Sequence, residues 1–159
     1  SMLTRERESI EGKRVCLMGT EFTVASSVYA DRLDSAGEVV RLGATITERT
    51  IAHLEHTTTE GRQRIVEEIG EVLRNVDAVA HVCTCFPLIA DLVEEINPRI
   101  HQLDPGRAIS HIVNWPEREG LNHLTVAVTG DTVSCDDVRA RAADLFPQWD
   151  RVKVVSLAD

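Results

Sequence analysis

The feature that most constrains the fold is an alternation of short apolar runs with segments of helical periodicity. Each run is short enough to be one buried strand, and the intervening segments are long enough to be crossover helices. This order is typical of βαβ units, in which helices cover a parallel sheet. We therefore predict an α/β fold, a three-layer sandwich with a mainly parallel sheet. The predicted strands are 14–18, 39–42, 78–82, 100–103, 124–128 and 152–157.

The segments between these runs carry apolar residues at every third or fourth position, as helices with one buried face require. Segment 47–59 is ambiguous, because a weak helical pattern there is followed by three consecutive threonines. Ser134 or Thr132 is the expected cap of the last helix. The longest expected loop is 116–122. The predicted helices are 23–36, 60–75, 87–96, 107–114 and 136–145.

The length of the chain, 159 residues, suits one domain. Residues 1–12 are expected to be a tag remnant, with Ser1 and Met2 at its start, and an N-terminal helix. Residues 13–159 are expected to form a single α/β domain, because no linker, repeat or low-complexity segment interrupts them.

Charge and hydropathy exclude several classes of partner. There are 17 basic and 26 acidic residues, a net charge of −9, which argues against binding nucleic acid or an anionic membrane surface. No apolar stretch approaches the roughly 20 residues that cross a bilayer. No secretory signal is visible, so the four cysteines are expected to be reduced thiols in the cytoplasm.

The candidate site lies where two predicted strands end. Ligands of open parallel sheets bind beyond the carboxyl ends of the strands. The clusters 19–23 and 83–85 both follow a strand and precede a helix, whose first N–H groups attract anions. Thr20 and Thr23 add hydroxyl donors, and a cysteine such as Cys83 is more reactive at a helix start. These features predict a carboxylate pocket.

Structural explanations compete with each of these assignments. A threonine such as Thr23 at a helix start is ordinarily an N-cap, and a cysteine after a strand is ordinarily a small buried apolar residue. Cys16, inside a predicted strand, is expected to be core, and Cys135 is expected to be incidental.

Metal and cofactor sites are not supported by the spacing of the residues. His81, Cys83 and Cys85 alternate and would share one strand face if the strand continued that far. The other candidate ligands, His53 and His56, are three residues apart but remote in sequence and lie on a weak helical pattern, so no metal site is predicted. The chain also lacks a glycine-rich phosphate loop and a nucleophile elbow, and no cofactor is predicted.

Four motifs, in the same order along the chain, resemble the aspartate/glutamate racemase superfamily. Residues 19–24, followed by Ser27, Val28 and Tyr29, resemble the opening of the second lobe of glutamate racemases. Residues 82–88 resemble the family segment Gly-Cys-Thr-His followed by an aromatic residue and Pro-Leu. Residues 103–106 and 129–131 resemble the family's Ile-Asp-Ser-Gly and Thr-Thr-Gly-Asp segments.

This resemblance implies cofactor-free acid/base chemistry at the carbon next to a carboxylate, an isomerase activity in which two cysteines flank the substrate. Cys83 matches the second-lobe cysteine, and Thr84 matches its substrate-holding neighbour. Thr20 and Thr23 match the two threonines that bind the amino acid. Cys85 stands at the pocket, where the family has a histidine that sets the protonation state of the thiol.

Two further departures separate the chain from the family pattern. No Cys-Asn-Thr motif, which carries the first-lobe cysteine, occurs here. The assisting glutamate is not clearly placed, with Glu48 and Glu55 as weak candidates. The expected ligand is a small carboxylate or acidic amino acid, bound at a site that is incomplete in the isolated chain. The alternatives are a non-catalytic binding or self-associating module and a one-cysteine decarboxylase or isomerase.

The missing first lobe also predicts how the chain behaves in solution. Racemisation needs a base on each face of the α-carbon, and one lobe presents only Cys83. We therefore expect little or no glutamate or aspartate racemase activity from the monomer. A homodimer is expected, because it would cover the apolar surface that a missing lobe leaves exposed.

Overall fold

The computed structural model describes residues 7–33, 37–104, 106, 123–129, 134–142 and 151–157. The chain divides into two compact units. Residues 1–51 and 55–114 form the first, hereafter the four-stranded unit. Residues 52–54 and 115–159 form the second, hereafter the two-stranded unit. The expectation that residues 13–159 are a single domain stays a prediction.

The four-stranded unit is built on a parallel sheet with the strand order β2-β1-β3-β4. Val15 of β1 is in register with Val39 of β2 and with Ala78 of β3. Ala78 is in turn in register with His101 of β4. The four strands were predicted within two residues of their ends. They are β1 (Val15–Gly19), β2 (Val39–Gly43), β3 (Ala78–His81) and β4 (His101–Leu103).

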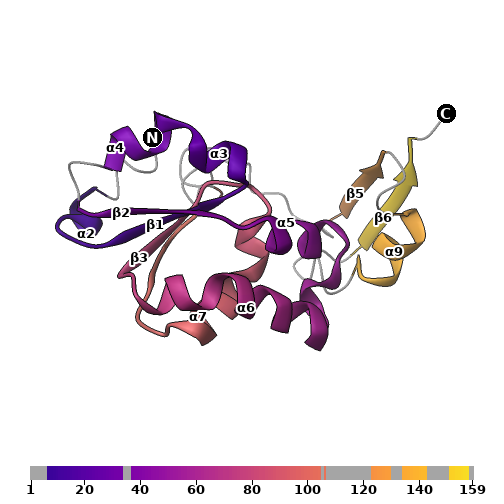
Figure 1. Cartoon of the computed structure of the whole chain (residues 1–159). Helices are drawn as coiled ribbons and strands as arrows, with labels where there is room; N and C mark the ends of the chain where they lie inside the picture. The colour runs from indigo at the N-terminus through magenta and orange to yellow at the C-terminus, as the bar shows by residue number, and fades with distance from the viewer. Residues whose placement is uncertain are drawn as a thin grey trace. The chain divides into compact units, whose positions relative to one another are not determined.

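Helices cover both faces of this sheet, so the predicted three-layer α/β architecture is confirmed for this unit (Figure 1). Alternate residues of β1 point to opposite faces. Val15 and Leu17 pack with α3 (Glu21–Ala25) and α4 (Ser27–Leu33). Cys16 and Met18 pack with the helices of the other face. Those helices are α5 (Thr45–Ala52), α6 (Thr59–Arg74) and α7 (Ala90–Ile96).

The predicted helix 23–36 is wrong in one respect, because it is two short helices. Ser26 between them has an extended backbone, with ψ of 136°, and its N–H bonds to the carbonyl of Thr23. The extended residue changes the direction of the chain between α3 and α4, and Val24 and Leu33 are both buried in the core. Residues 34–36 of the predicted helix lie outside the described residues.

Other helix boundaries also differ from the sequence prediction. The ambiguous segment 47–59 contains the end of α5 and a 3₁₀ turn, Glu55–Thr57, separated at Leu54, which has a positive φ of 58°. The helix predicted from Pro87 starts as a 3₁₀ turn, Phe86–Ile89, before α7. A further short helix, α2, covers Arg7–Ile10, and Ile10 is fully buried.

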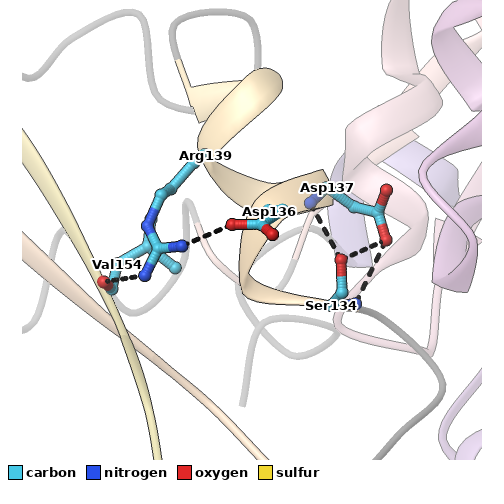
Figure 2. Close-up of polar contacts among 5 residues, drawn as sticks. All are labelled: Ser134, Asp136, Asp137, Arg139 and Val154. Carbon is cyan, nitrogen blue, oxygen red and sulfur yellow. Dashed lines mark hydrogen bonds and ion pairs between the residues drawn. The ribbon is translucent and has the colours of Figure 1, made fainter.

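The two-stranded unit contains β5 (His123–Val128) and β6 (Arg151–Ser156), which pair in parallel, and α9 (Cys135–Ala140). Ser134 caps α9 as predicted, and Asp137 completes a capping box with it (Figure 2). Arg139 connects the helix to the sheet, because its Nη2 donates to the carbonyl of Val154 at 3.2 Å.

Three sequence predictions fall mainly outside the described residues: the helix 107–114, the loop 116–122 and the end of the helix 136–145. None of the helices in the described ranges combines the length and apolar character that crossing a bilayer needs.

Candidate functional site

The two clusters predicted from the sequence leave the sheet from neighbouring strands. β1 and β3 are paired in parallel, and beyond their last pair the N–H of Val82 donates to the carbonyl of Met18 at 3.0 Å. The two strands are close here because Gly19 has no side chain. A Cβ on Gly19 would lie 2.8 Å from Cγ2 of Val82. The Thr20–Thr23 and Cys83–Cys85 segments therefore start side by side at the carboxyl edge of the sheet.

Thr20 and Thr23 form a hydroxyl pair at the start of α3. Thr20 is the N-cap, since its Oγ1 accepts the N–H of Thr23 at 3.2 Å. The cap is thus Thr20, not Thr23, because the helix begins two residues earlier than predicted. The two Oγ1 atoms are 2.8 Å apart, so one hydroxyl donates to the other. One hydroxyl hydrogen is left to donate to a ligand.

Because α3 has five residues, its dipole adds little attraction for an anion. A longer helix, 23–36, was predicted here, so the attraction of its first N–H groups for an anion is weaker than expected. The hydroxyl pair is the remaining attraction for a carboxylate at this end of the site.

Cys83 and Cys85 are in direct contact, with 3.4 Å between the two Sγ atoms. Both side chains are half-buried, and Thr84 between them is exposed. Burial first, and then the hydrogen bond and charge of Cys83, raise the pKa of Cys85 to about 12, with a smaller contribution from the Glu48 carboxylate. Cys85 is therefore a protonated thiol at neutral pH and can donate its S–H to Cys83.

His81 does not share a ligand set with the two cysteines, because β3 ends at His81 and the cysteines lie in the turn beyond it. Its Nε2 is 2.9 Å from Oε1 of Gln102. The amide nitrogen of Gln102 donates to the carbonyl of Ala90, so Oε1 is the acceptor and Nε2 of His81 the donor. Within the described ranges, no three His, Cys, Asp or Glu side chains are placed to hold a metal ion.

This arrangement leaves His81 neutral. Burial lowers the pKa of His81 more than the hydrogen bond that it donates to Gln102 and the charge of Asp104 raise it. Its Nδ1 is a buried acceptor without a hydrogen-bond partner in the described part of the chain. His81 thus connects the end of β3 to Gln102 of β4 and, through it, to Ala90 of α7.

The structure distinguishes between the two weak glutamate candidates. Glu55 is ion-paired with Arg64 on the 3₁₀ turn after α5. Glu48 lies on α5, close enough to Cys85 for its charge to act on that thiol. Glu48 is therefore the better candidate for a carboxylate beside the cysteines.

Glu68 of α6 is a positioning residue that the sequence reasoning missed. It accepts the N–H of Ile46 at 2.8 Å and both the N–H and the hydroxyl of Thr47 at 2.7 Å. These bonds fix the first turn of α5 and therefore the position of Glu48. Glu68 is remote in sequence from Thr47, and no local pattern in the sequence signals the pairing.

A cavity of about 510 Å³ lies along β4 and α7. Its described lining includes His81, Asp91, Glu94 and Asp104 but none of the five predicted site residues. The site predicted from the sequence is therefore carried by the two strand ends and not by this cavity.

No protein-family model matches the chain. Glutamate racemases of Streptococcus equi subsp. equi and subsp. zooepidemicus are each 21% identical to it over 121 residues, 71% of this chain and 46% of theirs. The chain spans about half the length of the curated relatives it matches.

Solved structures agree with this relationship. The aspartate racemase of Picrophilus torridus is 27% identical, with a TM-score of 0.54 over 70% of this chain and 47% of its own. The chain belongs to the aspartate/glutamate racemase superfamily. Its homology to glutamate racemase is distant and covers about one lobe.

Two glutamate racemase structures show how far the fold extends. An isoform from Bacillus anthracis has a TM-score of 0.66 at 15% identity, over 98% of this chain and 62% of its own. The enzyme from Francisella tularensis, solved in complex with D-glutamate, has a TM-score of 0.59 at 14% identity, over 98% and 63%. At these identities the likeness concerns the fold.

Proposed function

We propose that this racemase-superfamily domain binds a small carboxylate or acidic amino acid at the carboxyl edge of β1 and β3, with Cys83 as its proton-transferring group. The observation that carries the proposal is the pair of sulfurs 3.4 Å apart at the end of β3. The neighbouring strand β1 ends in the Thr20–Thr23 hydroxyl pair. The D-glutamate complex of the Francisella tularensis relative supports the choice of ligand class.

In this proposal the Cys83 thiolate removes the proton from the α-carbon of the bound amino acid. The S–H bond forms as the C–H bond breaks, and the electron pair of that bond stays on the α-carbon as a carbanion. Reprotonation from the same thiol reverses the step.

Cys85 takes over what the resemblance assigns to a histidine. With a pKa of about 12, it keeps its proton at neutral pH. Its S–H donates to the Cys83 sulfur across the 3.4 Å contact and stabilises negative charge there. The site thus retains a donor to the reactive sulfur although the family histidine is replaced.

The substrate carboxylate would accept the hydrogen bond that the Thr20–Thr23 pair has left to donate. Thr84, exposed beside Cys83, is proposed to contact the same ligand. Glu48 assists from α5 by its negative charge near the thiols, which attracts the ammonium group of an amino acid.

The proposed site is one-sided. Cys83 reaches one face of the α-carbon, and one positioned acid/base group contributes about 10²–10⁴-fold in rate. The isolated chain is therefore expected to exchange the α-proton with retention of configuration and to racemise glutamate or aspartate little or not at all.

The test is exchange of the α-hydrogen of L- and D-glutamate and L- and D-aspartate in deuterated water, followed by mass spectrometry and chiral chromatography. Slow deuterium incorporation without inversion is expected for the chain as a monomer. Cys83→Ser is expected to abolish it, and Cys135→Ser, in the two-stranded unit, to leave it unchanged. Exchange that survives in Cys83→Ser would rule out the assigned role.

A ligand-binding assay separates binding from chemistry. D-glutamate is expected to protect Cys83 from alkylation, and Thr20→Val with Thr23→Val is expected to weaken that protection. Protection that is the same in the native chain and in the double variant would place the carboxylate elsewhere.

The second face of the ligand is proposed to come from a second copy of the chain. Phe22, Ile46 and Leu88 are large apolar residues that are 89%, 49% and 46% exposed. Each follows the carboxyl end of a strand, β1, β2 or β3, at the edge that carries the site. Such a group of exposed apolar side chains favours an interface there.

Light scattering tests this assembly. A dimer is expected for the native chain and a monomer for Phe22→Asp, with Leu157→Asp as the control, since Leu157 is 59% exposed and lies after β6. A native monomer would exclude the homodimer.

The cytoplasmic location expected from the sequence stays a prediction.

A further inference from the structure

Cys83 and Cys85 are suited to chemistry with each other as well as with a substrate. Their sulfurs are already in contact at 3.4 Å, and one residue, Thr84, separates them in the sequence. Both thiols are free and half-buried, whereas Cys16 is fully buried within β1. An oxidant can therefore reach this pair and not the core thiol.

We propose that Cys83 and Cys85 are a peroxide-sensitive dithiol that closes reversibly to an intramolecular disulfide. The inference goes beyond the proposed function, because it concerns a modification of the two sulfurs whether or not the chain turns over an amino acid. Where the proposed function holds, the disulfide would also switch it off, since the Cys83 sulfur, bonded to the Cys85 sulfur, can no longer accept a proton from the substrate.

The chemistry takes two steps. The Cys83 thiolate attacks one oxygen of hydrogen peroxide, the O–O bond breaks, and hydroxide leaves, which gives a sulfenic acid on Cys83. The Cys85 sulfur then attacks the Cys83 sulfur, the S–O bond breaks, and the departing hydroxide takes the Cys85 proton as water. Two electrons pass from the two sulfurs to the peroxide, which gives one water and one hydroxide, and the hydroxide takes up the proton that the Cys83 thiol had released to solvent.

The raised pKa of Cys85 indicates the order of these two steps. Its pKa of about 12 keeps the Cys85 thiol protonated, so Cys83 is the sulfur that reacts first. The hydrogen bond and charge of Cys83 are among the causes that raise the pKa of Cys85. The charge is removed when Cys83 becomes a neutral sulfenic acid, whereas burial, the largest cause, is unchanged. The first oxidation therefore makes Cys85 a better nucleophile for the second step.

The disulfide is expected to be readily reduced. It would close a ring that spans only three residues, so it restricts the unfolded chain very little. Little stability would accompany the bond, and small strained disulfides are the labile, regulatory kind. Thiol reductants should reopen it.

A peptide-mass experiment tests the proposal without any substrate. Cleavage after arginine releases peptide 75–99, which contains Cys83 and Cys85 and neither of the other cysteines. The reduced chain is treated with hydrogen peroxide, alkylated with iodoacetamide, digested and weighed. The expected product is peptide 75–99 without alkyl groups and two hydrogens lighter, restored to the doubly alkylated form by dithiothreitol.

Three variants make the result decisive. Cys85→Ser and Cys85→Ala are expected to lose the disulfide and to accumulate sulfinic acid on Cys83, and Cys135→Ser to behave like the native chain. Native chain that forms sulfinic acid as fast as Cys85→Ser, or that stays doubly alkylated at the same dose, would overturn the proposal. A failed proton-exchange assay would leave this readout unaffected, so the two proposals fail separately.

Discussion

β1 and β5 are both parallel strands with mainly apolar sequences, yet their surroundings differ. All five residues of β1 are buried, whereas the residues of β5 alternate between exposed and half-buried. β1 lies between β2 and β3 and has helices on both faces. β5 pairs with β6, and α9 contacts β6 through Arg139. Coverage by neighbours, and not the apolar run itself, decides how much a strand contributes to a core.

The same contrast explains where chemistry is placed. The four-stranded unit has a buried sheet that can hold Cys83, Cys85 and the threonine pair at fixed strand ends. Matched residues of the two units should therefore respond differently to labelling and to truncation.

Thiol reactivity should show the largest effect, between Cys16 in the buried strand β1 and the half-buried Cys135 of the two-stranded unit. Burial raises the pKa of Cys16 to about 12, so at pH 8 it should alkylate about 10³-fold more slowly than an ordinary thiol. Cys135, half-buried at the start of α9, and Cys83 should both react within a time in which Cys16 does not. Time-resolved iodoacetamide labelling with peptide masses measures the rates. Equal slow labelling of Cys83 and Cys16 would show that Cys83 is simply core.

Leucine truncation compares the two sheets directly. Leu17→Ala, in β1, removes a fully buried side chain and should lower the free energy of unfolding by about 2–5 kcal/mol. Leu124→Ala, in β5, removes a half-buried one and should cost about 1 kcal/mol. Urea denaturation gives both values. Equal losses would mean that the two sheets are equally well packed.

Protonation of His81 should make the stability of the four-stranded unit depend on pH. Burial lowers the pKa of His81, so the unfolded chain binds its proton at a higher pH than the folded chain does. The free energy of unfolding should therefore fall as the pH falls below about 6.5, by up to about 1.4 kcal/mol per pH unit.

His81→Gln keeps a donor for Gln102 and removes the titration. The free energy of unfolding of this variant should change less with pH over the same range. Both proteins should be compared relative to their values at pH 8, where His81 is neutral in the folded and the unfolded chain. Identical slopes in urea melts of the two proteins would show that His81 is not the group responsible.

The capping box of α9 should give the smallest effect. Ser134→Ala removes the oxygen that accepts the N–H of Asp137 at 3.1 Å, and should cost about 1 kcal/mol. Hydrogen exchange of the α9 amides is the measurement, with Thr58→Ala, the N-cap of α6, as the matched variant. If the two-stranded unit unfolds by itself, the Ser134 variant should speed exchange there and leave the α6 amides unchanged.

Much of the candidate site followed from local pattern. The apolar runs of β1 and β3 placed Thr20 and Cys83 just beyond two strand ends, and parallel pairing brought those ends together. The contact of Cys83 with Cys85 did not follow, because the sequence alone allowed the strand to continue. It depends on the chain turning after His81. The closeness of Glu48 to Cys85 depends in turn on Glu68, which fixes the start of α5 from another helix.

The sequence by itself determined the alternation of strands and helices and the burial of Cys16, and it narrowed the cap of α9 to Ser134 or Thr132, because each depends on residues a few positions apart. Only the tertiary structure decided the break at Ser26, the separate pairing of β5 with β6 and the contact between the two thiols. These features depend on how elements distant in sequence pack. The free energy of that packing comes from buried area and geometry that no local window of residues contains.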